Sequence, residues 1–170
     1  MIKLKMAELR SRIWKCAGLS AVGAAIPVPG VPVVLDLGII IHEAMFYFKQ
    51  LGLDRTSLQR YATLYLVDYD ELQSIVRRTL GFRIAGEVTS ESIKSILLTL
   101  LPRLLPVAAA AAAEEAARFL PLIGGLIAAP LSFGGTYLSL KTILDKFEKP
   151  ALEVMKFAAG RVGEADEVYW

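Results

Sequence analysis

Residues 16–35 of the sequence read CAGLSAVGAAIPVPGVPVVL, twenty positions without a charged side chain. About twenty apolar residues suffice for a helix to cross the hydrocarbon core of a bilayer. The stretch is interrupted near its middle by Pro27, Pro29 and Gly30, and then by Pro32. A proline inside a helix costs about 3 kcal/mol or more, because it removes a backbone N–H and clashes with the preceding turn. The pattern therefore predicts two apolar helices joined by a turn.

A second uncharged stretch covers residues 119–140 and reads FLPLIGGLIAAPLSFGGTYLSL. It is interrupted at Pro121, Gly124-Gly125, Pro130 and Gly134-Gly135. In lipid, the backbone groups freed by such breaks have no water to bond. The breaks favour a buried helical hairpin in each of the two stretches. Two membrane-spanning or membrane-inserting segments remain the alternative.

The composition fits a chain with a large apolar core. Of its 170 residues, 55% are hydrophobic and 21% are charged, against about 45–50% and about 25% in ordinary soluble domains. Such a chain is not disordered, and its one cysteine, Cys16, excludes a disulfide scaffold and suits the cytosol. The formal charge is only +2. A nucleic-acid partner is therefore not expected, because nucleic-acid-binding proteins carry a strong basic bias.

The rest of the chain shows helical rather than alternating periodicity. The first helix is expected over residues 4–25, with Leu9 and Ile13 on its inner face. The second is expected over residues 33–51, whose middle is apolar all round, as in a central element. Further helices are predicted after Thr56, over 72–80, after Thr89, and over 107–120, 137–147 and 151–159.

Polar residues and glycines mark where several of these helices begin and end. Thr56 with Gln59, and Asp68 with Glu71, have the spacing of capping boxes, in which the two side chains bond the free N–H groups of the first turn. Gly52 lies where a glycine ends the second helix. These signals place short helices between the two long uncharged stretches.

The predicted fold is one all-α domain over residues 1–170, a multi-helix bundle with Pro/Gly-broken hydrophobic hairpins and no sheet. Residues 1–25 form a first helix that changes from basic to apolar, residues 33–147 form the bundle core, and residues 151–170 form a terminal helix and tail. Pro150 is expected to break or kink the last helical stretch, because it lies inside an otherwise helical pattern.

The sequence offers no catalytic constellation. Residues 81–88 carry two glycines at the spacing of a phosphate-binding loop, but Glu87 and Val88 stand where that loop needs Lys and Ser or Thr. His42 is the only histidine and lies far along the chain from Cys16, for which core packing is favoured over a nucleophilic role. We therefore predict a chain that is not itself an enzyme, with no catalytic, cofactor-binding or metal-binding residues.

A basic arm opens the chain, and it allows three interpretations. The arm is a solvated helix start, a surface attracted to anionic lipid, or a contact for a protein partner. Its candidate contact residues are Lys3, Lys5, Arg10, Arg12 and Lys15.

Residues 104–120 form the second candidate contact region, because they combine a wide apolar surface with few charges. The segment is either a membrane-lying amphipathic helix or a helix with a solvated polar edge. The acidic pair Glu114 and Glu115 argues against lipid, since interfacial helices are rich in Lys and Arg on their polar face. The candidate contacts here are Leu104, Leu105, Arg118 and Phe119.

Several stretches, in order and spanning residues 12–157, resemble one known family. They are Arg12-Ile13-Trp14, Leu19–Ala25, Ile26-Pro27-Val28-Pro29-Gly30-Val31, Phe46-Tyr47-Phe48-Lys49-Gln50-Leu51-Gly52-Leu53-Asp54, Ser57-Leu58-Gln59-Arg60, Ala85-Gly86-Glu87-Val88-Thr89, Arg118-Phe119-Leu120-Pro121-Leu122-Ile123-Gly124, Pro130-Leu131-Ser132-Phe133 and Tyr137. Each stretch is weak alone, but the ordered set is specific. The chain resembles the C-terminal helical domain of the interferon-inducible, immunity-related GTPases.

The resemblance implies a role in cell-autonomous immunity. Members of that family are dynamin-like GTPases that gather on vacuoles around intracellular pathogens and oligomerise with GTP. Their helical domain contributes to membrane targeting, in some members through an amphipathic helix that aligns roughly with residues 104–120. No nucleotide domain is present in this sequence, so GTP and magnesium are expected only in a full-length parent. The chain is then a fragment, a truncated product or a free-standing helical paralogue.

The resemblance and the residues together predict a non-catalytic helical module for membrane association and oligomerisation. The expected partners are a membrane surface, the nucleotide domain of a parent chain and other copies bound through it. The expected location is the cytoplasm, on the surface of endomembranes or of pathogen-containing vacuoles. The alternative is an integral or membrane-inserting helical protein that works without a GTPase domain.

Overall fold

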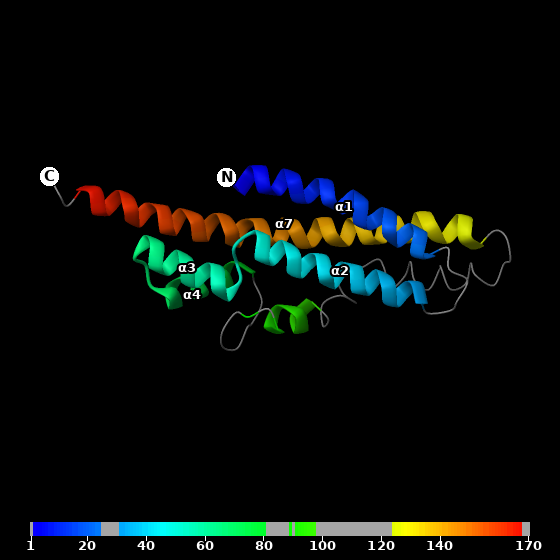
Figure 1. Ribbon diagram of the computed structural model, residues 1–170, viewed down its shortest axis with the longest axis horizontal. Helices are drawn as coiled ribbons and strands as arrows, with labels where there is room; N and C mark the ends of the chain where they lie inside the picture. Colours follow the sequence, from blue (N-terminus) through cyan, green and yellow to red (C-terminus); the bar gives the residue numbers. More distant parts are fainter. Residues whose placement is uncertain (1, 25–30, 81–88, 90, 98–123, 168–170) are drawn as a thin grey trace.

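The computed structural model describes residues 2–24, 31–80, 89, 91–97 and 124–167 (Figure 1). Its helices are α1 (Ile2–Ala24), α2 (Val31–Gln50), α3 (Arg55–Tyr65), α4 (Tyr69–Leu80) and α7 (Gly124–Glu167). Residues 91–97 are also helical, and no strand occurs in the described ranges. The predicted all-α fold without a sheet is therefore confirmed for the part of the chain that the structure describes.

The long helix α7 is the element on which the others pack. It contacts α1, α2, α3 and α4. Figure 1 shows α7 running along most of the molecule, with α1 antiparallel to it, α2 parallel to it, and α3 and α4 beside its C-terminal half. The N-terminal half of α7 is therefore left to pair with α1 and α2, and these three helices carry the surfaces described below.

The first uncharged stretch is divided as predicted, since α1 ends at Ala24 and α2 begins at Val31. The second stretch is not. Helix α7 is 44 residues long and continues from Gly124 through Pro130, Gly134 and Gly135. The hairpin predicted within residues 119–140 is therefore wrong over the part that the structure describes.

Pro150 also lies inside α7, so the two helices expected on either side of it are one. The proline itself is buried, and so are Phe147 before it and Ala151 after it. Packing of α7 against four other helices supplies more stability than the lost backbone hydrogen bond removes. Local sequence preference gives way here to tertiary contacts.

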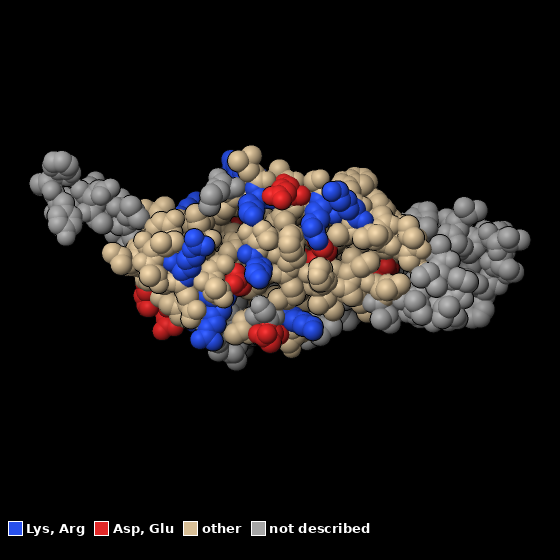
Figure 2. Space-filling model, in the orientation of Figure 1, with Lys and Arg blue, Asp and Glu red and all other residues tan. Residues whose placement is uncertain are grey.

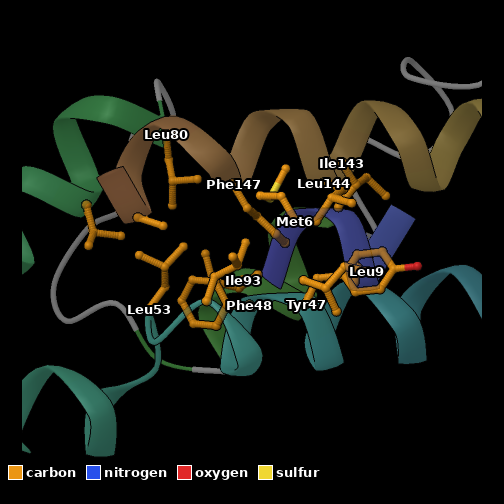
Figure 3. Packing of buried hydrophobic residues seen from close by; sticks show 14 of the residues in the cluster. Met6, Leu9, Tyr47, Phe48, Leu53, Leu80, Ile93, Ile143, Leu144 and Phe147 are labelled. Carbon is orange, nitrogen blue, oxygen red and sulfur yellow. The ribbon is translucent and has the colours of Figure 1, made fainter. Parts of the chain in front are cut away.

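A single apolar core fills the space between the helices (Figure 3). The predicted inner stripe of the first helix is confirmed, because Leu9 and Ile13 are buried there. Tyr47 and Phe48 of α2 are fully buried, and the ring of Phe48 meets that of Phe147 edge-on, with 5.6 Å between their centroids. Each large apolar side chain buried in this way contributes about 1.5–3 kcal/mol.

The start of α3 corrects one expectation. The residue that caps its N-terminus is Asp54, not Thr56, since the Asp54 carboxylate accepts hydrogen bonds from Ser57 N at 3.4 Å and from Ser57 Oγ at 2.5 Å. A carboxylate at this position also meets the positive end of the helix dipole. Gly52 has a φ of +72° after α2, which confirms the predicted stop, and an added Cβ there would lie 2.2 Å from Tyr61 Oη.

Two other predicted helix caps are confirmed, although α4 (Tyr69–Leu80) begins before residue 72, where the helix was predicted to start. Helix α4 begins at Tyr69, directly after Asp68, whose Oδ1 accepts from the backbone N of Asp70 at 3.3 Å. The helical stretch 91–97 follows Thr89, whose backbone N donates to Ser92 Oγ at 2.9 Å while Ser92 N donates to Thr89 Oγ1 at 3.2 Å. This reciprocal pair of bonds satisfies free N–H groups at the helix start.

Among the residues described, no helix combines the length and the apolar character needed to cross a membrane. The phosphate-loop-like segment 81–88 and the helix predicted over 107–120 lie outside the described residues.

Candidate interaction surface

A partly buried ion pair joins α1 to α2. Arg12 donates from Nε to Glu43 Oε2 at 2.7 Å and from Nη2 to Glu43 Oε1 at 2.9 Å, and such two-pronged bonding fixes orientation as well as distance. The guanidinium carbon also lies 4.2 Å from the centroid of the Phe46 ring, a favourable position for a cation. The Glu43 side chain is 5% exposed and that of Arg12 is 43% exposed. Arg12, a predicted contact residue, thus holds two helices together.

The ion pair also sets the protonation of its neighbours. Burial by itself raises the pKa of Glu43, but the hydrogen bonds and charge of Arg12 outweigh burial and hold that pKa below its usual value. Burial first, and then the charge of Glu43, raises the pKa of Cys16 to about 11 and also raises the pKa of Tyr47. The Cys16 thiol is therefore protonated at neutral pH, as in an inert packing role.

An open groove of about 460 Å³ lies between α1 and α2. Its apolar walls come from Leu19, Leu35 and Ile39, and the Arg12–Glu43 pair lines it as well. Within the described residues, no group of three or more His, Cys, Asp or Glu side chains could hold a metal ion. The groove presents an apolar surface with one neutralised ion pair.

Three aromatic rings gather on the other side of α1, where it meets α7. The ring of Trp14 lies 5.4 Å from that of Phe133 and 5.0 Å from that of Tyr137, measured between centroids. Phe133 and Tyr137 stack almost parallel, with an angle of 6° between them. We call these three residues the aromatic patch. It is open to solvent, because Trp14 is 58% exposed and the adjacent Leu138 is 50% exposed.

Beyond Trp14, the outward side of α1 is apolar with one positive charge. Lys15, Leu19 and Val22 are exposed and follow one another at the i, i+4 and i+7 spacing of one helix face. Figure 2 shows basic and acidic side chains interspersed among uncharged ones on the face that carries α1 and α2. No broad field of one sign covers this face. Its distinctive feature is the exposure of large apolar side chains.

The predicted basic contact residues divide into two groups. Besides Arg12, Arg10 donates to Asp145 Oδ1 at 3.3 Å and to Glu148 Oε2 at 3.4 Å on α7, and Lys5 donates to Gln50 Oε1 at 2.7 Å. These three side chains pair with other helices of the same chain.

The second group holds Lys3 and Lys15, which are exposed. Neither bonds an acidic partner within the described ranges. The remaining candidates, Leu104, Leu105, Arg118 and Phe119, lie outside those ranges.

A buried polar network joins α1, α2 and α7 beneath this surface. Ser20 Oγ bonds Asp36 Oδ1, and it lies 2.7 Å from Ser132 Oγ and 2.8 Å from Thr136 Oγ1. Ser132 Oγ lies 2.7 Å from Asp36 Oδ2. All four side chains are buried. Small hydroxyl-bearing residues therefore take the place of large apolar ones at this point of the helix interface.

Sequence reasoning missed the aromatic patch and the polar network. One signal for the patch was available, because Phe133 and Tyr137 are four residues apart and share a helix face once the segment is helical. Their pairing with Trp14 crosses more than one hundred residues of sequence. No local pattern indicates that pairing.

The fold and its surfaces define a helical bundle with an exposed apolar and aromatic face. The chain is similar to Interferon-inducible GTPase 5 of Rattus norvegicus, 29% identical over 153 residues, and of Bos taurus, 30% identical over 149 residues. The alignments cover 90% and 86% of this chain but only 31% and 30% of the relatives. The resemblance to interferon-inducible GTPases is thus confirmed, and the chain spans about a third of the length of these relatives. No protein-family profile and no solved structure matches it.

Proposed function

We propose that the chain is a non-catalytic helical module through which a GTPase of the interferon-inducible type associates with a membrane surface. The contact is made by the aromatic patch and by the outward side of α1. The observation that carries the proposal is the exposure of Trp14, 58%, and of Leu138, 50%, beside two further aromatic rings.

The chemistry of the patch suits the boundary between lipid headgroups and hydrocarbon. Tryptophan and tyrosine have an apolar body and a polar tip, and both are enriched at membrane–water interfaces. Lys15, the exposed residue that follows Trp14 on α1, supplies a positive charge on a long flexible stem that suits anionic headgroups. This geometry supports peripheral contact rather than insertion.

The wider role is part of the same proposal. The relatives are named interferon-inducible GTPases, and we propose that the module belongs to a defence protein of that type, active on the cytoplasmic faces of endomembranes or of pathogen-containing vacuoles. GTP and magnesium belong to a nucleotide domain of the parent protein. That domain and further copies of the protein are the module's other partners.

Flotation of the purified chain with anionic phosphatidylserine vesicles tests the proposal. Wild type is expected to float with the vesicles, and Trp14→Ala is expected to lower the bound fraction severalfold. The matched control is Leu64→Ala, which removes a similarly exposed apolar side chain from α3 (63% exposed) and should leave flotation unchanged. Equal losses in both variants, or no flotation of wild type, contradict the proposal.

Self-association through the same patch is the competing outcome. Sedimentation velocity of the same two variants separates the two roles. If wild type forms dimers that Trp14→Ala abolishes, and vesicles do not bind, the patch serves oligomerisation instead of membrane association.

A further inference from the structure

The groove between α1 and α2 is lined by one face of each helix. On α1, Arg12, Cys16 and Leu19 follow one another at the i, i+4 and i+7 spacing. The lining residues on α2 are Leu35, Gly38, Ile39, His42 and Glu43. The volume of about 460 Å³ lies within the range of about 300–1,000 Å³ that is typical of small-molecule sites.

The groove is polar at one end and apolar at the other. Because α1 and α2 run antiparallel (Figure 1), the Arg12–Glu43 pair marks one end, and Leu19 lies toward the other. A Cβ added at Gly23 would lie 3.4 Å from Leu35 Cδ1, so Leu35 stands beside the last turn of α1. A molecule that lies along the groove therefore meets charged groups at one end and apolar side chains at the other.

The polar end offers N–H donors. A guanidinium has five of them, and the two bonds to Glu43 use one N–H on Nε and one on Nη2 of Arg12. These bonds neutralise the buried Glu43 carboxylate, whereas the Arg12 side chain is half-exposed and the His42 side chain is 76% exposed. Donors on an exposed cation favour an anionic partner, and a carboxylate is well suited because its two oxygens accept in parallel.

Gly38 leaves the middle of the groove open. A Cβ added there would have no heavy atom within 4 Å. Glycine inside a helix is unfavourable for the helix itself, so its presence in α2 is not explained by helix stability. Its effect on the groove is to leave space between the polar and the apolar end.

The length of the groove sets the length of its ligand. Arg12 and Leu19 are seven residues apart on one helix face, which is about 10 Å at about 1.5 Å per residue. An extended chain of single bonds covers that distance in about eight bonds, at roughly 1.2 Å per bond.

We propose that the groove binds a fatty acid, a single-chain carboxylate with a chain of about eight carbons or more. Its carboxylate accepts hydrogen bonds from Arg12 and His42, and its chain lies along Leu19, Leu35 and Ile39. This site goes beyond the proposed membrane contact. It shares only Leu19 with the outward side of α1, and it includes no residue of the aromatic patch.

A methyl NMR titration of the purified chain with monomeric decanoate tests the proposal. The methyl signals of Leu19, Leu35 and Ile39 are expected to shift and to saturate at one decanoate per chain, while those of the exposed Leu64 on α3 stay unchanged. Decylammonium has the same chain and the opposite charge, and butanoate has the same charge and a short chain. Each is expected to bind at least tenfold more weakly. The proposal is overturned if decanoate causes no saturable shift, if it shifts Leu138 beside the aromatic patch instead, or if decylammonium binds equally well.

Gly38→Leu provides the matched variant. Its added side chain enters the open space of the groove, and leucine favours a helix more than glycine does, so the variant is expected to fold and to bind decanoate at least tenfold more weakly. The control is Gly160→Leu, because Gly160 also lies in a helix with no heavy atom within 4 Å of an added Cβ. This control should bind as wild type does. Undiminished binding by Gly38→Leu overturns the proposal.

Two further measurements separate this site from other roles. Gly38→Leu is expected to float with vesicles as wild type does, so failure of the fatty-acid site and failure of the membrane contact are read independently. Sedimentation velocity tests whether a second copy of the chain covers the groove instead. Dimers that Gly38→Leu abolishes, in a chain that decanoate does not bind, overturn the fatty-acid site.

Discussion

The centre of the bundle and the junction of α1, α2 and α7 are built in opposite ways. At the centre, large apolar side chains such as Phe48 and Phe147 are buried and charged groups lie outside. At the junction, small polar residues such as Ser20 and Thr136 are buried, and Trp14 stands largely exposed nearby along α1. Burial of large apolar side chains therefore stabilises the centre of the bundle. At the junction, hydrogen bonds between small polar side chains connect the helices instead, and an aromatic patch remains exposed beside them.

Truncation at the centre should have the largest effect on stability. Phe48→Ala removes a fully buried ring that meets Phe147 edge-on, and such changes cost about 3–5 kcal/mol. Urea unfolding followed by circular dichroism measures the loss. The control is Leu66→Ala, since Leu66 is almost fully exposed and should change stability by less than about 0.5 kcal/mol. A loss below about 1 kcal/mol for Phe48→Ala would mean that the centre is not the main source of stability.

The Arg12–Glu43 pair lies between the two regions and should give the next largest effect. Arg12→Ala removes both bonds that the buried Glu43 carboxylate accepts from the guanidinium and leaves His42 Nδ1 at 3.6 Å from Glu43 Oε1. We expect this change to cost about 2 kcal/mol after allowance for the half-exposed arginine. Arg12→Lys should lose less, because a lysine keeps the charge but not the two-pronged bonds. Thermal unfolding of the two variants checks the order, and equal losses would contradict the role of the bidentate geometry.

Acid should weaken the same pair. The pKa of Glu43 is held below its usual value in the folded protein. The stability that the ion pair contributes is therefore complete above about pH 4.3, the pKa of a glutamate in the unfolded chain. It is lost as the pH falls through the lower pKa that Glu43 has in the folded protein. Unfolding of Glu43→Gln between pH 3 and pH 6 should lack this acid-dependent loss, whereas wild type should show it.

The cap of α3 predicts a smaller effect that separates the observed start from the one expected from sequence. Asp54→Ala removes the carboxylate that bonds Ser57, and loss of a cap costs about 1 kcal/mol. Thr56→Ala is the matched control, since Thr56 is exposed within the first turn, and it should cost only a few tenths of a kcal/mol. The reverse order in chemical denaturation would restore Thr56 as the cap.

The last predicted change is a gain of stability at the centre, similar in size to the loss of the cap. The Tyr47 hydroxyl is buried and finds no hydrogen-bond partner in the described part of the chain. Tyr47→Phe removes a buried hydroxyl that makes no hydrogen bond. We therefore expect the free energy of unfolding to increase by about 1 kcal/mol. A lower melting temperature for Tyr47→Phe would indicate that the hydroxyl has a partner.

The all-α fold was predictable because its main signal is local. The spacing of Leu9 and Ile13 defines the inner face of α1. Gly52, with its positive φ, allows the chain to turn after the end of α2. The continuity of α7 was not predictable. Pro150 disfavours a helix by its own geometry, and only packing against distant helices reverses that preference.

The candidate surface was predictable only in part. The basic arm was visible in the sequence, but the partners of Arg12 and Arg10 lie 31 and at least 135 residues away along the chain. No local pattern indicates that these arginines serve the helix interfaces. Ser20 and Ser132 are 112 residues apart, and their contact likewise exists only after α1 and α7 have packed. Contacts of this kind depend on the fold and not on neighbouring residues.

Fluorescence of Trp14 tests the proposed membrane contact most directly. The chain has two tryptophans, and Trp170→Phe leaves Trp14 as the only one. Addition of phosphatidylserine vesicles is expected to shift the emission of Trp14 to shorter wavelengths, and brominated lipid is expected to quench it, because the ring enters the interface. An unchanged spectrum in a sample whose protein floats with the vesicles would contradict the assignment of this face as the membrane contact.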